Sequence, residues 1–198
     1  MAKVLVLNGS PMPKMNSTSY KLLQFFVNEY RKNNPKDEII ELDLNELEMS
    51  TVGLTSKNIG EFFDEENSAK YIKLLKEVNK IIISVPMINL AIPTLVKNFF
   101  DRIIVAGQTF TYEGSTDGKA IGLLDHLKIQ IIATQGSPTT ALEPKQVQLV
   151  EMMWRFLGSK ISPSFLAPGT NVPPLANMTK DQIVDTFKDE LIAKAKAF

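Results

Sequence analysis

Three segments with nearly continuous apolar sequence constrain the fold of this chain more than any other feature. They are VLVL at residues 4–7, KIIISVP at 80–86 and IQIIA at 129–133. A strand of this kind is apolar on both faces, which is typical of a parallel sheet with helices on each side. Residues 38–42 alternate between polar and apolar side chains and indicate an edge strand, and residues 161–167 predict a fifth strand.

Apolar residues at helical spacing occupy the segments between these strands. They predict helices over residues 18–33, 71–78, 93–106, 147–157 and 181–197. Strands that alternate with helices form a doubly wound parallel sheet. We therefore expect an α/β fold with five parallel strands in the flavodoxin-like order 2-1-3-4-5. Helices should cover both faces, and a hairpin excursion over residues 109–127 should precede strand 4.

Two segments depart from this simple pattern. The helix over residues 93–106 carries apolar residues on more than one face, so it is either deeply buried or meets another subunit. Residues 44–65 are polar and weakly patterned, and we expect a variable loop with some helix. The acidic run Asp64-Glu65-Glu66 is interpreted as the solvated start of a helix.

The composition excludes several classes of function. Lys plus Arg equals Asp plus Glu at 22 each, so the net charge is zero, and a nucleic acid or an anionic membrane is disfavoured as the main partner. The chain has no cysteine, which excludes disulfide scaffolds, zinc–thiolate sites and iron–sulfur clusters. No apolar run approaches the roughly 18 residues of a membrane span, and the amino-terminal residues lack a signal-peptide pattern. We expect a cytoplasmic protein.

Three polar loops follow the predicted strands, at residues 8–18, 86–92 and 134–139. The carboxyl ends of parallel strands meet at one edge of the sheet, and ligands bind there where the strand order reverses. We therefore expect the three loops to form one binding site. Each loop also has a simpler interpretation, because Asn, Ser and Gly are common in ordinary turns and helix caps.

The first loop has the composition of a phosphate site. A helix amino terminus at Ser17 or Thr18 offers unpaired N–H groups, and Ser10 and Asn16 add side-chain donors. The loop lacks the Gly-Lys-Ser/Thr of a Walker sequence and the three glycines of a dinucleotide fingerprint. It also has no acidic residue for magnesium. A terminal phosphate bound without a metal fits a flavin mononucleotide better than a nucleoside triphosphate.

The other two loops could hold a flat ring. Met87, Ile88 and Leu90 are apolar, and the amide of Asn89 can donate and accept hydrogen bonds, as the pyrimidine end of a flavin requires. A backbone N–H near Gly136 could stabilise a reduced ring electrostatically. The simpler alternative is a turn at Asn89 with core packing around it.

Three segments resemble the FMN-dependent NADH-azoreductases, once mislabelled acyl carrier protein phosphodiesterases, within the flavodoxin-like quinone reductases. They are KVLVLNGSP, PMINLAIPTLVKNFFDRIIVAGQTFTYEG and IIATQGS. The resemblance covers nearly the whole chain, in order and with compatible spacing, and its middle segment is the most specific part. It implies that residues 1–198 are a single flavodoxin-like FMN-binding domain.

The resemblance also assigns roles to residues. In this family the FMN phosphate, the isoalloxazine ring and the other edge of that ring are held by three successive groups. The matching groups here are Ser10, Asn16, Ser17 and Thr18; Met87, Ile88, Asn89 and Leu90; and Thr134, Gln135, Gly136 and Ser137. Two positions depart from the family pattern. Ile88 stands where an aromatic residue is common, and Ser137 where a second Gly is common, and both affect the expected acceptor range more than FMN binding.

The family's chemistry is a two-electron, ping-pong transfer in a homodimer with each active site near the subunit interface. NADH gives a hydride to flavin N5 and leaves, and a quinone or azo compound then enters the same pocket. Because the flavin carries the hydride, no catalytic acid or base of the protein is required. Nothing in the sequence marks a 2′-phosphate site that would separate NADPH from NADH.

A flavodoxin-like electron carrier, or an FMN-binding protein without nicotinamide turnover, is the alternative function. Carriers tend to be strongly acidic, whereas this chain is neutral. His126 is the only histidine, has no clustered metal ligands, and is interpreted as exposed and structural. Trp154 is expected in the core.

Overall fold

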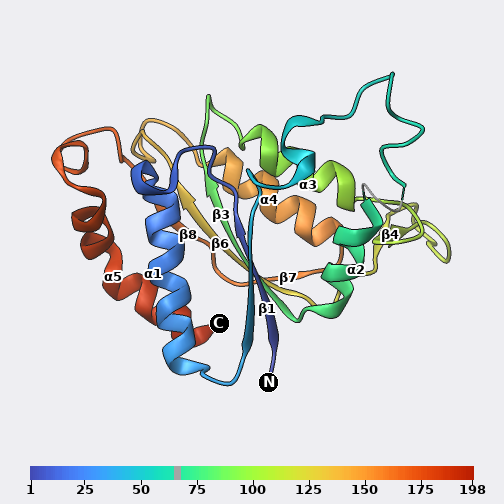
Figure 1. The fold of residues 1–198 in the computed structure, drawn as a ribbon, viewed down its shortest axis with the longest axis horizontal. Helices are drawn as coiled ribbons and strands as arrows, with labels where there is room; N and C mark the ends of the chain where they lie inside the picture. Colours follow the sequence, from blue (N-terminus) through green and yellow to red (C-terminus); the bar gives the residue numbers. More distant parts are fainter. Residues whose placement is uncertain (65–67) are drawn as a thin grey trace.

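The computed structural model describes residues 1–64 and 68–198. A six-stranded parallel sheet runs through it in the order β2-β1-β3-β6-β7, with β8 also paired to β6 (Figure 1). The helices and strands of the described residues are β1 Lys3–Asn8, η1 Lys14–Asn16, α1 Thr18–Asn33, β2 Glu38–Asp43, η2 Glu48–Thr51, α2 Lys70–Glu77, β3 Lys80–Pro86, α3 Thr94–Ile103, β4 Phe110–Thr111, β5 Ile121–Gly122, β6 Lys128–Thr134, α4 Lys145–Phe156, β7 Lys160–Ile161, β8 Phe165–Ala167, η4 Leu175–Asn177 and α5 Lys180–Ala197. The predicted parallel sheet, its first four strands and their order are confirmed.

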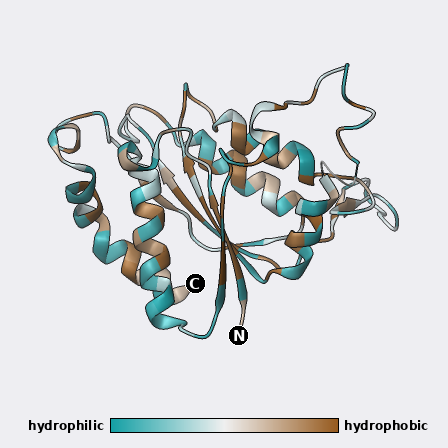
Figure 2. Ribbon diagram, in the orientation of Figure 1, coloured by the Kyte–Doolittle hydropathy of each residue, from teal (hydrophilic) through white to brown (hydrophobic). Residues whose placement is uncertain are grey.

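Both faces of the sheet are buried, as the continuous apolar strands predict. On β1, Val4 and Val6 pack in one cluster with α1 and α5, while Leu5 and Leu7 pack in the other with α2, α3 and α4. Figure 2 shows the strands as the most hydrophobic part of the chain and the helices as two-sided. Since adjacent strand residues point to opposite faces, an apolar residue at every position is needed to fill both layers.

Helices α1 and α5 lie side by side on one face and run in the same direction (Figure 1). The Nζ of Lys21, in the first turn of α1, lies 3.1 Å from Oδ1 of Asp181, in the first turn of α5. Both helices therefore begin at the same edge of the sheet. That edge also carries the loops that follow β1, β3 and β6.

The predicted fifth strand over residues 161–167 is wrong in one respect, because it is two short strands. β7 pairs with β6 at Ile129↔Ile161, and β8 pairs with β6 at Ile132↔Phe165. Pro163 lies between them, and a proline has no N–H to donate to a ladder. Its carbonyl instead accepts from Gln130 Nε2 at 3.3 Å.

The hairpin excursion before β6 is confirmed as a small antiparallel pair. Phe110 pairs with Gly122, and Thr111 pairs with Ile121. Gly122 lies so close to the end of α4 that an added Cβ would be 2.1 Å from the backbone N of Gly158. Gly158 has φ +89° and follows the end of α4 in the left-handed conformation that glycine favours.

The chain itself covers the broad apolar surface of α3, which confirms the first of the two alternatives for this helix. The buried guanidinium of Arg102 stacks 4.0 Å from the centre of the Phe62 ring and donates to the Val52 carbonyl at 3.1 Å. Asn98 Nδ2 donates to the Met49 carbonyl at 2.7 Å. The segment predicted as a variable loop therefore packs over α3. The helix is shorter than predicted, and Pro93 is its N-cap rather than its first residue.

Several smaller expectations also have an outcome. Trp154 is fully buried, and His126 is exposed with Nε2 3.1 Å from the Leu75 carbonyl oxygen. Glu65 and Glu66, expected at the solvated start of a helix, lie outside the described residues. In the described part of the chain, no helix is long and apolar enough to cross a membrane.

Candidate functional site

A cavity of about 290 Å³ lies at the carboxyl edge of the sheet, between the loops that follow β1, β3 and β6. Its lining residues are Ser10, Met12, Asn16, Ser17, Thr18, Ser19, Pro86, Met87, Ile88, Thr134, Gln135, Gly136, Thr170, Asn171 and Lys180. Nine of the twelve residues predicted for the site are among them: the four of the first loop, Met87 and Ile88 of the second, and the first three of the third. The structure therefore brings the three loops together.

The first loop is tied to the start of α1 by a pair of serines. Ser17 Oγ donates to Ser10 Oγ at 2.8 Å and accepts from the Tyr20 N–H at 3.1 Å. Both serines are buried. Ser17 is thus the N-cap of α1, so the simpler interpretation of this residue is confirmed, and the same residue lines the cavity.

The amino terminus of α1 offers donors to the cavity. The first four N–H groups of an α-helix have no partner within the helix. Here the N–H of Tyr20 is taken by the cap and that of Lys21 by the Ser17 carbonyl, while those of Thr18 and Ser19 have no hydrogen-bond partner among the residues that the structure describes. Both residues line the cavity. Free N–H groups and the positive end of the helix dipole suit an anion of phosphate size.

Gly9 lets the first loop pass very close to β3. A Cβ at this position would be 2.3 Å from the Ser84 carbonyl oxygen and 2.6 Å from Val96 Cγ2. The Gly9 N–H donates to Ser84 Oγ at 3.0 Å. The absence of a side chain therefore sets where Ser10 enters the cavity.

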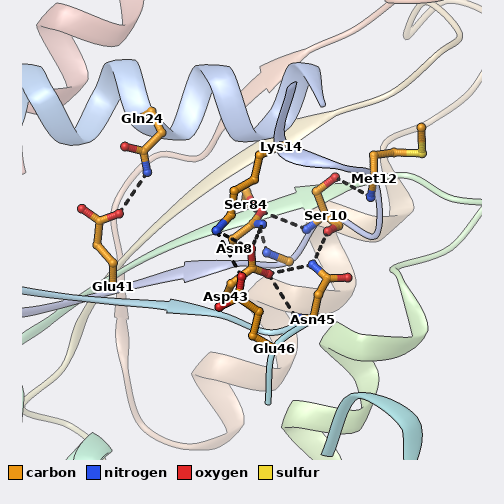
Figure 3. A network of polar contacts seen from close by, with 11 residues as sticks. Asn8, Ser10, Met12, Lys14, Gln24, Glu41, Asp43, Asn45, Glu46 and Ser84 are labelled. Atoms are coloured by element: carbon orange, nitrogen blue, oxygen red, sulfur yellow. Dashed lines mark hydrogen bonds and ion pairs between the residues drawn. The ribbon is translucent and has the colours of Figure 1, made fainter. Parts of the chain in front are cut away.

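A polar network around Asp43, at the end of β2, fixes the outer side of this loop (Figure 3). Asn45 Nδ2 donates to Asp43 Oδ1 at 2.7 Å and to the Ser10 carbonyl at 2.8 Å. Asn8 Nδ2 and Lys14 Nζ lie 3.1 and 3.0 Å from Asp43 Oδ2. Burial raises the pKa of Asp43, but these hydrogen bonds outweigh it and lower the pKa below its ordinary value. Lys14 is bound here and does not line the cavity.

The second loop contributes its first two residues to the cavity and turns the next two away. The Met87 N–H donates to the Thr134 carbonyl at 2.8 Å, which joins the second and third loops. Ile88 and Ala91 exchange two backbone hydrogen bonds around Asn89 and Leu90, which have φ of 47° and 69°. Leu90 is 70% exposed, and neither central residue of the turn lines the cavity.

The third loop is held by its own glutamine. Gln135 Nε2 donates to the carbonyls of Ser137 and Leu142, both at 2.9 Å. Gln135 is 1% exposed, and its Oε1 has no hydrogen-bond partner within residues 1–64 and 68–198. A Cβ on Gly136 would lie 2.6 Å from Nδ2 of Asn171, so Gly136 admits that side chain. Ser137 does not line the cavity.

Sequence reasoning missed six lining residues: Met12, Ser19, Pro86, Thr170, Asn171 and Lys180. Thr170 and Asn171 had a usable signal, since they follow β8 and therefore lie at the same sheet edge. Their N–H groups donate to the carbonyls of Gln135 and Gly136 at 3.1 Å. Lys180 had no sequence signal, because its place depends on how α5 packs beside α1.

A larger cavity, of about 580 Å³, lies elsewhere, between α5 and the strands β6 and β7. It is lined by residues such as Lys128 and Ile161, at the starts of the strands and near the end of α5. Ligands of parallel sheets bind beyond the carboxyl ends of the strands, so the smaller cavity is the candidate site.

The chain was compared with known proteins. The family described as flavodoxin-like fold matches residues 2–191. FMN-dependent NADH:quinone oxidoreductase 1 of Mesoplasma florum is 42% identical over 199 residues, and the FMN-dependent NADH:quinone oxidoreductase of Metamycoplasma arthritidis is 43% identical, each match covering 100% of both chains. The crystal structure of an azoreductase from Bacillus anthracis str. Sterne is 26% identical, with a TM-score of 0.75 and 100% of both chains covered. The chain therefore belongs to the flavodoxin-like fold family and, within it, to the group that includes the FMN-dependent NADH:quinone oxidoreductases and azoreductases.

Proposed function

We propose that this protein is an FMN-dependent oxidoreductase that transfers two electrons from NADH to quinones, azo compounds or both. One observation carries the proposal: three strand-end loops form one cavity that combines an open helix amino terminus with an apolar segment. Such a site suits a molecule with a phosphate at one end and a flat ring at the other. The relatives named NADH:quinone oxidoreductases support the same assignment.

Different residues of the cavity would contact the phosphate and the ring of such a molecule. The N–H groups of Thr18 and Ser19 and the side chains of Ser10 and Asn16 would bind the phosphate. Met87 and Ile88 would contact one part of the ring, because both are apolar and line the cavity.

The third loop would meet the polar edge of the ring. Thr134, Gln135 and Gly136 line the cavity beside the second loop, joined to it through the Met87 N–H. Gln135 Oε1, which has no partner in the described part of the chain, can accept a hydrogen bond from a polar ligand. When bound, FMN supplies the hydride-accepting centre, and the protein supplies position and electrostatics.

The direct test is cofactor binding followed by reduction. The purified protein, incubated with FMN and desalted, should retain a yellow flavin that NADH bleaches within the time of a stopped-flow experiment. A protein that stays colourless after incubation with FMN contradicts the proposal.

The ping-pong order and the acceptor class can be tested separately. Because NADH and the acceptor would use one pocket in turn, double-reciprocal plots at several quinone concentrations should give parallel lines. Converging lines would mean that both substrates bind together. A panel of quinones and azo dyes, assayed with NADH and with NADPH, would define the substrate range.

An electron carrier without nicotinamide turnover is the second candidate, and its support is the fold alone. Such a protein would bind FMN but would not be reduced by NADH. The zero net charge argues against it, since carriers use charge to steer redox partners.

We also propose that the protein works as a homodimer. Apolar side chains gather, exposed, where the β4–β5 hairpin meets α4, and they are Tyr112, Ile121, Leu123, Met152 and Phe156. The hairpin and α4 are joined through the Phe110 and Phe156 rings, whose centres are 4.8 Å apart. An apolar patch of this kind is a common contact surface between subunits. Sedimentation should give a dimer, and Met152→Glu should shift it toward the monomer; a wild-type monomer contradicts the proposal.

A further inference from the structure

Lys180 is a cation inside the candidate site that no sequence pattern indicated. It is the first residue of α5, it is partly buried, and it lines the cavity with the first loop. Within the described residues no carboxylate forms an ion pair with it, and the adjacent Asp181 pairs with Lys21. The fifteen lining residues include no Asp or Glu. Lys180 is therefore the one charged residue among these fifteen.

The packing of the two helices places Lys180 at the phosphate end of the cavity. The contact between Lys21 and Asp181 joins the first turns of α1 and α5 at 3.1 Å. Lys180 therefore lines the cavity from the helix turn that adjoins the first turn of α1, which carries Thr18 and Ser19, whereas Met87 and Ile88 belong to the second loop.

The first turn of α5 is held rigidly. Thr179 Oγ1 accepts from the Gln182 N–H at 3.2 Å, and Gln182 Oε1 accepts from the Thr179 N–H at 2.8 Å. This capping box fixes the backbone from which the Lys180 side chain extends. Because the backbone at Lys180 is already fixed, less conformational entropy is lost when a ligand binds.

The cavity shows a second sign of an absent polar partner. The Gln135 side chain is almost fully buried, yet its Oε1 has no hydrogen-bond partner among the residues described. Buried polar atoms without partners are rare, and a ligand that completes the site is one explanation for such an atom. Lys180 and Gln135 come from different elements and both line this cavity.

We propose that Lys180 provides the counter-charge for the phosphate of bound FMN and thereby selects the phosphorylated flavin over riboflavin. The inference rests on the proposed function, and adds to it one residue and one specificity. A lysine beside open helix N–H groups gives a phosphate dianion a point charge as well as hydrogen bonds.

The test compares the affinities of FMN and riboflavin, measured by quenching of flavin fluorescence. Lys180→Gln should weaken FMN binding by about 10- to 100-fold, as expected for a charge-assisted hydrogen bond, and leave riboflavin binding unchanged. The dependence of FMN affinity on salt should become weaker in the same variant. Lys180→Arg should restore most of the FMN affinity. Lys188→Gln, an exposed lysine of the same helix outside the cavity, is the matched control and should change neither affinity.

Each other outcome has a clear meaning. Equal loss of FMN and riboflavin affinity in Lys180→Gln would indicate a structural role and overturn the inference, as would unchanged FMN affinity. A raised KM for NADH with unchanged FMN affinity would overturn it as well, because the lysine would then serve the dinucleotide phosphate. Wild-type protein that binds neither flavin would reject the proposed function itself.

Discussion

The hydroxyl groups of Ser10 and Ser17 lie 2.8 Å apart and join the end of β1 to the start of α1. This side-chain contact closes the loop between them. Ser10 Oγ also accepts from the Met12 N–H at 3.3 Å. The conformation of the loop and the cap of the helix are therefore set together, at the wall of the candidate site.

Ser17→Ala should test this coupling. The substitution removes the N-cap of α1, which lowers the free energy of unfolding by about 1 kcal/mol, and it also removes the contact to Ser10. FMN affinity should therefore fall together with stability. Thr179→Ala, which removes the cap of α5, is the stability reference in the same urea titration. Unchanged FMN affinity in Ser17→Ala would separate the cap from the site.

Substitution of three glycines by alanine should lower the free energy of unfolding to different extents. Gly9→Ala should destabilise by about 1–3 kcal/mol, because its Cβ overlaps backbone and a core side chain. Gly136→Ala should cost much less in stability, because its Cβ meets only the side chain of the exposed residue Asn171. Gly60→Ala is the control, since nothing lies within 4 Å of its Cβ, and it should stay within about 0.5 kcal/mol of wild type. Thermal unfolding of the three variants would check the order, and equal costs for Gly9→Ala and Gly60→Ala would contradict it.

Leu90→Gly should stabilise the protein. Leucine at φ 69° is in the left-handed region, which costs a residue with a side chain about 1–2 kcal/mol. Because the side chain is 70% exposed, little packing is lost, and the larger unfolded-state entropy of glycine leaves a net gain of at most about 1 kcal/mol. Leu54→Gly, at another exposed leucine outside that region, should destabilise. Denaturant midpoints measure both changes, and a destabilised Leu90→Gly would show that the leucine has a contact in the assembled protein.

Sequence reasoning reached the strands and the convergence of the loops because these follow from local pattern. Continuous apolar runs such as residues 80–86 require two buried faces, and parallel strands bring their carboxyl ends to one edge. Nine of twelve predicted site residues line the cavity for that reason. Asn89 and Leu90 do not line it, since a tight turn with two positive φ angles directs the backbone outward. Asparagine adopts positive φ more readily than most residues, so the simpler alternative of a turn at Asn89 is confirmed, whereas leucine at position 90 gives no such signal.

The features that sequence reasoning missed depend on contacts between distant segments. Lys180 reaches the site only because α5 packs beside α1. The cover of α3 comes from residues 49–62, whose polar sequence gave no sign of the contacts to Asn98 and Arg102. The break between β7 and β8 had one local signal, Pro163, whose effect on a strand depends on its neighbours.

Asp43→Asn should weaken the network behind the first loop. The wild-type carboxylate is 9% exposed and accepts from Asn8, Lys14 and Asn45. Removing the charge should lower the free energy of unfolding by about 1–3 kcal/mol at pH 7, as for other buried charged hydrogen bonds. Because Asn45 also holds the Ser10 carbonyl, FMN affinity should fall as well. Asp185→Asn, at an exposed residue of α5, is the control and should change neither quantity.

The pH dependence of this variant follows from the direction of the Asp43 shift. The pKa of Asp43 in the folded protein is lower than its ordinary 3.8, so the folded state favours the ionised carboxyl. Its contribution to stability is therefore complete above that ordinary value and is lost as the pH falls through the lowered one. The difference in unfolding free energy between wild type and Asp43→Asn should be constant near neutrality and shrink in acid. A difference that persists unchanged below the ordinary pKa would show that the amide acts through shape rather than charge.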